Sequence, residues 1–242
     1  MTCMEIVKKN MNRLAQNSYP GRGIIIGMSP DSKNMIQVYW IMGRSENSRN
    51  RVFIEENGNV KIEAYDPARL KDPSLVIYYP VRQYENKHIV TNGDQTDTIY
   101  NFLKEKTGTF EDALDTRTFE PDAPNFTPRI SGLIDLDDKN TLYRLSILKS
   151  LDNNPDITKR FYFKYSKALP GAGHLIHTYE SDGNPLPSFE GEPYMVELFN
   201  NIDQVADFYW NLLNEENRVS LLVKFINLET KKSVIKIVNK HK

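Results

Sequence analysis

The sequence predicts an α+β fold in which mostly antiparallel sheets are covered by helices. Segments with strand character outnumber helical segments, and the helical segments occur in only a few places. Asn57-Gly58 separates two strand-like segments and signals a hairpin, because both residues tolerate a positive φ. A sandwich of two sheets with helices on its outside would bury this many strands.

The chain opens with an expected amphipathic helix over Met4–Leu14. Its apolar residues recur at positions 4, 7, 11 and 14, and its lysines and asparagines fall on the other side. The segment Tyr19-Pro20-Gly21 ends this pattern, since proline and glycine both interrupt a helix.

The first half then continues with short apolar segments of strand character. Apolar positions at helical spacing predict a helix over Asp94–Lys106 and another that begins at Thr109 and reaches Leu114. Asp115–Pro128 contains three prolines and is expected to be a loop. The strands expected in this half are Gly23–Gly27, Met35–Met42, Arg51–Glu55, Val60–Tyr65, Leu75–Arg82 and Lys87–Thr91.

The second half is again rich in short segments of strand character. A turn-rich loop is expected over Ser181–Pro193, and a helix with one apolar face over Asp203–Leu213. The strands expected here are Arg129–Leu136, Leu142–Leu148, Arg160–Tyr165, Leu175–Tyr179, Val219–Leu228 and Ser233–Val238.

Charge and cysteine content exclude several classes of protein. The 31 Lys+Arg residues balance 32 Asp+Glu residues, which argues against a general binder of nucleic acid or membrane surfaces. A single cysteine, Cys3, excludes an internal disulfide and a CxxC metal site. No segment approaches the roughly 20 apolar residues that cross a bilayer, and no apolar run follows the basic residues at the amino terminus. We expect a cytoplasmic protein.

Two clusters in the first half could carry chemistry. Arg44, Arg49 and Arg51 lie close together after a predicted strand, and their planar guanidinium groups suit phosphate. They could equally form a solvated loop paired with surface acids. Tyr78 and Tyr79 end a predicted strand, where a hydroxyl could donate to an oxyanion or the rings could simply pack at a sheet edge.

Two loops add polar residues. Thr91–Asp97 opens a predicted helix, where Asn92-Gly93 would let the backbone pass close to a ligand and Asp94 could serve as a cap. Glu120–Arg129 offers two carboxylates and an arginine in a proline-stiffened loop, which would cost little entropy to order.

The second half contains no nucleotide-fold or metal motif. Gly171-Ala172-Gly173 lacks the remaining glycine spacing of a dinucleotide-binding turn. His174 and His177 point to opposite faces if they lie in one strand, which makes a shared metal ion unfavourable.

Taken in order, the segments YPGRGIIIG, YWIMGRSENSRNR, YYPVR, TNGDQTD, EPDAPNFTPRISG and PGAGHLIHTYESDGNPLPSFEGEP resemble the archaeal-type IMP cyclohydrolase family. The resemblance begins near Tyr19. It implies a single domain over residues 1–242, in which residues 1–18 form an N-terminal helical extension.

The resemblance also implies a fold similar to the N-terminal-nucleophile hydrolases, with two sheets in a four-layer αββα sandwich. The implied reaction is the closure of 5-formamidoimidazole-4-carboxamide ribonucleotide to IMP with loss of water, which requires no metal or redox cofactor. A small purine ribonucleotide is the expected partner, and assembly into a homo-oligomer stays open.

By resemblance, three catalytic residues are expected: Arg51, Tyr78 and Glu120. Tyr79 is the alternative to Tyr78, and Asp122 is the alternative to Glu120. The residues expected to bind substrate are Arg22, Arg44, Arg49, Asn50, Asn92, Asp97 and Arg129.

Two other functions compete with this hypothesis. An amidohydrolase could use Thr2 as a nucleophile after removal of Met1, but such a nucleophile should begin a buried strand rather than a polar helix. A non-catalytic nucleotide-binding protein would need the arginines but not the complete set of Arg51, Tyr78 and Glu120.

Overall fold

The structure is a computed structural model, and it describes residues 2–70, 73 and 76–241. Met1 and Leu75, the first residue of one predicted strand, lie outside these residues.

Within these residues the strands form two sheets, and every pair of neighbouring strands is antiparallel. The first sheet has the order β11-β10-β1-β2-β12-β13, with β1 at Gly23–Met28, β2 at Asn34–Met42, β10 at Ala172–His177, β11 at Tyr194–Glu197, β12 at Arg218–Asn227 and β13 at Ser233–Asn239. The second sheet has the order β3-β4-β5-β6-β7-β8-β9, with β3 at Val52–Glu56, β4 at Asn59–Glu63, β5 at Val81–Tyr84, β6 at Lys87–Thr91, β7 at Arg129–Asp135, β8 at Tyr143–Leu151 and β9 at Asn154–Tyr165.

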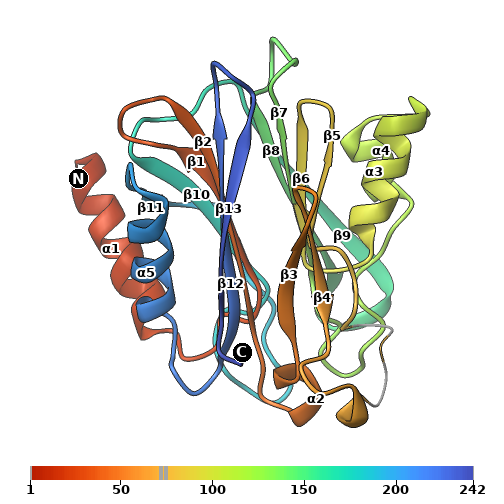
Figure 1. Ribbon diagram of the computed structural model, residues 1–242. Coiled ribbons are helices and arrows are strands. Elements are labelled where there is room, and N and C mark those ends of the chain that lie inside the picture. Colours follow the sequence, from red (N-terminus) through yellow and green to blue (C-terminus); the bar gives the residue numbers. More distant parts are fainter. Residues whose placement is uncertain (1, 71–72, 74–75, 242) are drawn as a thin grey trace.

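Helices cover the outer face of each sheet, so the molecule has four layers in the order α, β, β, α (Figure 1). Helix α1 (Cys3–Gln16) lies against β11, and α5 (Ile202–Leu212) lies against β12 and β13. On the other side, α3 (Gln95–Glu105) packs on β5 and β6 and contacts α4 (Phe110–Asp115). The predicted αββα sandwich is therefore confirmed. No helix in the described ranges has the length and apolar character needed to cross a membrane.

The apolar pattern of the strands explains this stacking. Eight of the nine residues of β2 are buried, because its outer face lies under helices and its inner face lies on the second sheet. Met11 and Leu14 of α1 are buried in the same core, as the helical spacing predicts. A smaller core under α3 and α4 contains Ile99 and Phe110.

The hairpin between β3 and β4 forms where predicted. Asn57 and Gly58 both adopt a positive φ, of 53° and 77°, and they form the turn.

One predicted strand is wrong. Over Leu75–Arg82 the strand begins only at Val81, because the preceding residues turn at Pro73, whose carbonyl accepts from the backbone N–H groups of Val76 and Ile77. Pro80 also has no N–H to give to a ladder. Pattern reading misses β11 and the single-turn helix α2 (Glu46–Arg49), which are both only four residues long.

Candidate active site

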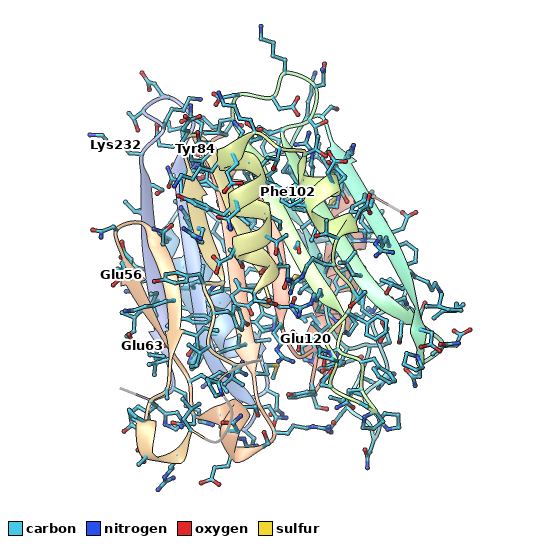
Figure 2. All side chains as sticks on the ribbon, turned by 90° about the vertical axis from the view of Figure 1, so that its right-hand side faces the viewer. Glu56, Glu63, Tyr84, Phe102, Glu120 and Lys232 are labelled. Atoms are coloured by element: carbon cyan, nitrogen blue, oxygen red, sulfur yellow. The ribbon has the colours of Figure 1, made fainter. Side chains whose placement is uncertain are left out.

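Five polar side chains from both sheets and their connecting loops meet in the interior. Arg22 directly precedes β1, Tyr39 lies in β2, and Arg51 directly precedes β3. Tyr78 lies just before β5, and Glu120 lies in the loop between α4 and β7. Figure 2 shows Glu120 in the lower half of the molecule, away from Tyr84 and Lys232 at the upper end. We call these five residues the inner cluster.

Each arginine of the inner cluster has a buried hydrogen-bond donor that is unused, and Arg51 is buried as a whole while Arg22 keeps 11% of its side chain exposed. Arg51 has no exposed surface, and it donates from Nε to the Ser48 carbonyl at 2.8 Å and from Nη2 to the Met42 carbonyl at 3.3 Å. Its Nη1 and the Nε of Arg22 are buried and find no partner among the described residues. Unmade donors of this kind are costly in a protein interior unless a ligand takes them up.

These two arginines repel each other. Burial and the neighbouring charge of Arg22 lower the pKa of Arg51. The carboxylate that approaches them most closely is Glu120, whose Oε2 lies 4.0 Å from Nη2 of Arg22. Two guanidinium groups thus face one carboxyl group, and the inner cluster is suited to an anion or to an oxygen that gains negative charge.

Glu120 is placed to exchange a proton near neutral pH. Its side chain is almost fully buried. Burial raises its pKa to about 7, although the charges of Arg22 and Arg129 act in the opposite direction. Asp122, the alternative, is instead committed to its own turn, since its carboxylate accepts from the backbone N–H and the hydroxyl of Thr127.

The structure also distinguishes the two adjacent tyrosines. The Tyr78 hydroxyl lies 2.7 Å from the hydroxyl of Tyr39 inside the molecule. Tyr79 is half-buried and its hydroxyl donates to Glu56 at 3.2 Å. Tyr78 therefore belongs to the inner cluster and Tyr79 does not.

Arg129 and Asn92 lie beside Glu120, where they shape the loop. Arg129 donates to Gln95 at 2.7 Å and pairs at 2.7 Å with Asp94, a carboxylate that it shares with Arg117. Asn92 binds backbone groups on both sides, accepting from the Ile130 N–H and donating to the Pro128 carbonyl. A Cβ at Gly93 would lie 2.5 Å from Nη1 of Arg129, so a side chain at this position would displace the end of Arg129. Asp94, predicted as a helix cap, makes no side-chain capping bond.

The remaining predicted residues lie nearer the surface. Arg44, Arg49 and Asn50 share a hollow of about 450 Å³ with Glu46, Tyr65, Asp66, Arg69 and His241. In this hollow the Asn50 side chain bonds to both backbone groups of Asp66: its Nδ2 donates to the carbonyl, and its Oδ1 accepts from the N–H. Asp97 lies neither in the inner cluster nor in this hollow. Its half-exposed carboxylate pairs with Arg82 at 2.6 Å.

Sequence reasoning missed Tyr39, which belongs to the inner cluster. It lies in an apolar strand segment, where an aromatic residue looks like core packing. Tyr179 stacks on Tyr19 with ring centroids 5.9 Å apart and shares a hydrogen bond with Thr127. Thr127 lies in the candidate loop Glu120–Arg129 and Tyr179 in the last of the quoted segments, but neither residue is given a role by the sequence.

The two histidines behave as the strand pattern predicts. Nδ1 of His174 lies 2.8 Å from the hydroxyl of Tyr143 in the second sheet, whereas His177 packs against Phe189 and Tyr194. In the described part of the chain, no three His, Cys, Asp or Glu side chains gather as a metal site would require.

The protein is thus a four-layer αββα sandwich whose interior holds Arg51, the tyrosine pair Tyr39 and Tyr78, and a glutamate of raised pKa, a set of groups suited to an anion. A family model described as IMP cyclohydrolase-like protein matches residues 19–232, from just after α1 to the turn before β13, and the chain belongs to this family. No curated protein matches the chain. The family resemblance predicted from the motifs is confirmed.

Proposed function

We propose that the protein is an IMP cyclohydrolase, which closes 5-formamidoimidazole-4-carboxamide ribonucleotide to IMP in purine biosynthesis. The observation that carries this proposal is the inner cluster, in which two unpartnered arginine donors face Glu120 and Tyr78 in the interior of a member of this family.

The reaction joins two groups of one molecule. The carboxamide nitrogen attacks the formyl carbon and loses one of its two protons as the new C–N bond forms. The formamido nitrogen then loses its proton as the formyl oxygen leaves as water, and a C=N bond forms in the new ring. Holding the two groups in contact can supply roughly 7–11 kcal/mol in favourable intramolecular cases. The chemistry therefore depends on orientation, on proton transfer and on stabilising a developing oxyanion.

Four residues of the inner cluster share the last two of these tasks. Arg51 and Arg22 stabilise negative charge on the formyl oxygen, to which Tyr78 donates a hydrogen bond. One such donor is commonly worth about 3–4 kcal/mol. Glu120 accepts a proton from the attacking nitrogen and returns it to the departing oxygen, since its pKa of about 7 suits both steps.

The surface hollow supports a second contact with the nucleotide. Arg49 donates from Nε to the Gly43 carbonyl and from Nη2 to the Asn217 side chain, and neither partner carries a charge. An anionic 5′-phosphate would therefore meet an unbalanced guanidinium there. Arg44, by contrast, is already paired with Asp182.

The Thr2 alternative has little support in the geometry. The Thr2 hydroxyl accepts from the backbone N–H of Glu5 and caps α1, which lies on the outside of the first sheet. The inner cluster lies on the other side of that sheet.

The test is direct. Purified protein is mixed with the formylated ribonucleotide, and IMP is followed by absorbance, with heat-unfolded protein as the control. We expect IMP to form faster than in the control. Tight binding of the substrate without faster formation of IMP would favour the non-catalytic nucleotide-binding protein instead.

A further inference from the structure

Tyr39 joins the inner cluster through one contact. It lies in the middle of β2, has no exposed surface, and places its hydroxyl 2.7 Å from that of Tyr78. Its ring stacks on Phe53, with ring centroids 5.7 Å apart. The ring packing would survive loss of the hydroxyl, so the hydroxyl needs its own explanation.

The direction of this hydrogen bond follows from its surroundings. Only one of the two hydroxyls can donate across the contact. Among the described residues each hydroxyl is the other's sole hydrogen-bond partner, but Tyr39 has no exposed surface whereas Tyr78 keeps 7% of its surface exposed. If Tyr39 accepted, its own proton would be buried and unused, whereas a proton left on Tyr78 can reach a ligand. Tyr39 therefore donates, and the proton of Tyr78 stays available for another acceptor.

The charges of the site act on both hydroxyls. Burial and the neighbouring Tyr78 raise the pKa of Tyr39 well above its usual value, although Arg22 and Arg51 act to lower it. Burial also raises the pKa of Tyr78, and Arg51 and Arg22 again act to lower it. The arginines therefore lie near both tyrosines, and the remaining exposure of Tyr78 makes its hydroxyl the external donor.

We propose that Tyr39 is a positioning residue that commits the Tyr78 hydroxyl to donate its proton to the formyl oxygen of the substrate. This inference rests on the proposed function. Without the bond from Tyr39, Tyr78 could rotate or act as an acceptor, and the substrate would lose an oriented donor.

The test is a double-mutant cycle in the IMP-forming assay. Tyr39→Phe keeps the ring and should lower kcat roughly tenfold, the effect of one hydrogen bond, with little change in KM. In the Tyr78→Phe background the same change should have almost no further effect on kcat. A purely structural role would instead lower kcat by the same factor in both backgrounds, and that result would overturn the proposal.

Tyr143→Phe is the matched control. It also removes a buried tyrosine hydroxyl between the sheets, one bonded to His174 at 2.8 Å, but it does not touch the inner cluster. We expect its kcat to match that of the wild type. Thermal unfolding of each variant shows whether the fold is kept.

A second substitution tests the proposal even if Tyr39→Phe fails to fold. Incorporation of 3-fluorotyrosine at position 39 keeps the ring and makes its hydroxyl a stronger donor, so kcat should be kept or raised. A clear fall in kcat would contradict the assigned direction. If the wild type forms no IMP, the proposed function fails; if the wild type is active and Tyr39→Phe is equally active, only the role of Tyr39 fails.

Discussion

Arg49 and Arg51 are two residues apart, yet the fold gives them opposite surroundings. Arg49 is exposed at the end of α2 and bonds to neutral oxygen atoms, whereas Arg51 has no exposed surface and lies near the charge of Arg22. The same guanidinium group interacts much more strongly with a charge when water is excluded. Under the proposed function, Arg49 would hold the nucleotide loosely at the surface and Arg51 would stabilise reacting atoms in the interior.

The largest effect is expected at the buried arginine. Arg51→Lys keeps the charge but loses the planar fork that reaches both Ser48 and Met42, so the donor to the substrate is misplaced. We expect kcat for IMP formation to fall about 100-fold to 1000-fold, as for a lost oxyanion donor. Activity within a few-fold of the wild type would remove Arg51 from the reacting centre.

The second largest effect is expected at Glu120, whose buried carboxyl group should make the stability of the protein depend on pH. Its pKa stands near 7 in the folded protein against an ordinary value of 4.5, so the fold favours the protonated form. The wild type therefore loses stability as the pH rises from about 4.5 to about 7. Glu120→Gln should be more stable by on the order of 3 kcal/mol at about pH 8, and the difference should vanish below about pH 4.5. Urea unfolding at both pH values measures this, and equal stability at the higher pH would speak against a desolvated carboxyl group.

The exposed arginine should respond far more weakly. Arg49→Lys is expected to leave kcat unchanged, and Arg49→Met should raise KM about twofold to fivefold because an exposed ion pair is worth little. The increase should shrink when salt is added, since salt screens exposed charges. A fall in kcat as large as that of Arg51→Lys would break the distinction between the two arginines.

The smallest effect on turnover is expected at Thr2, which precedes α1 on the outer face of the first sheet. Thr2→Ala removes the cap of α1 and should cost about 1 kcal/mol of stability in the urea assay. Turnover should stay at the level of the wild type, because Thr2 lies far from the inner cluster in this fold. Loss of turnover at full stability would revive the nucleophile hypothesis.

Much of the fold could be predicted from local pattern. The spacing of Met11 and Leu14 predicts the buried face of α1, and Asn57-Gly58 predicts the β3–β4 hairpin, because both signals are contained in a few adjacent residues. The strand expected at Leu75–Arg82 was misplaced because the backbone N–H groups of Val76 and Ile77 bond to the Pro73 carbonyl instead of a neighbouring strand. The strand β11 is too short to show a period.

The site was harder to predict, since burial of a polar side chain depends on packing between distant segments. The sequence shows that Arg49 and Arg51 are both arginines, but not that only Arg51 turns inward. Tyr39 gives no polar signal inside its apolar strand, although its contact with Tyr78 spans 39 positions. Of the residues named from the family motifs, the structure brings Arg22, Arg51, Tyr78 and Glu120 together, whereas Asp97 pairs with Arg82 elsewhere.

The central claim is that the inner cluster performs the ring closure through proton transfer at Glu120. The measurement that tests it most directly is kcat/KM for IMP formation from about pH 5 to about pH 9 in the wild type and in Glu120→Gln. The wild type should gain activity as the pH rises through about 7, where Glu120 loses its proton, and the variant should lack this rise and be at least about 100-fold slower at the upper end. No IMP formation by the wild type, or the same profile in both proteins, would contradict the claim.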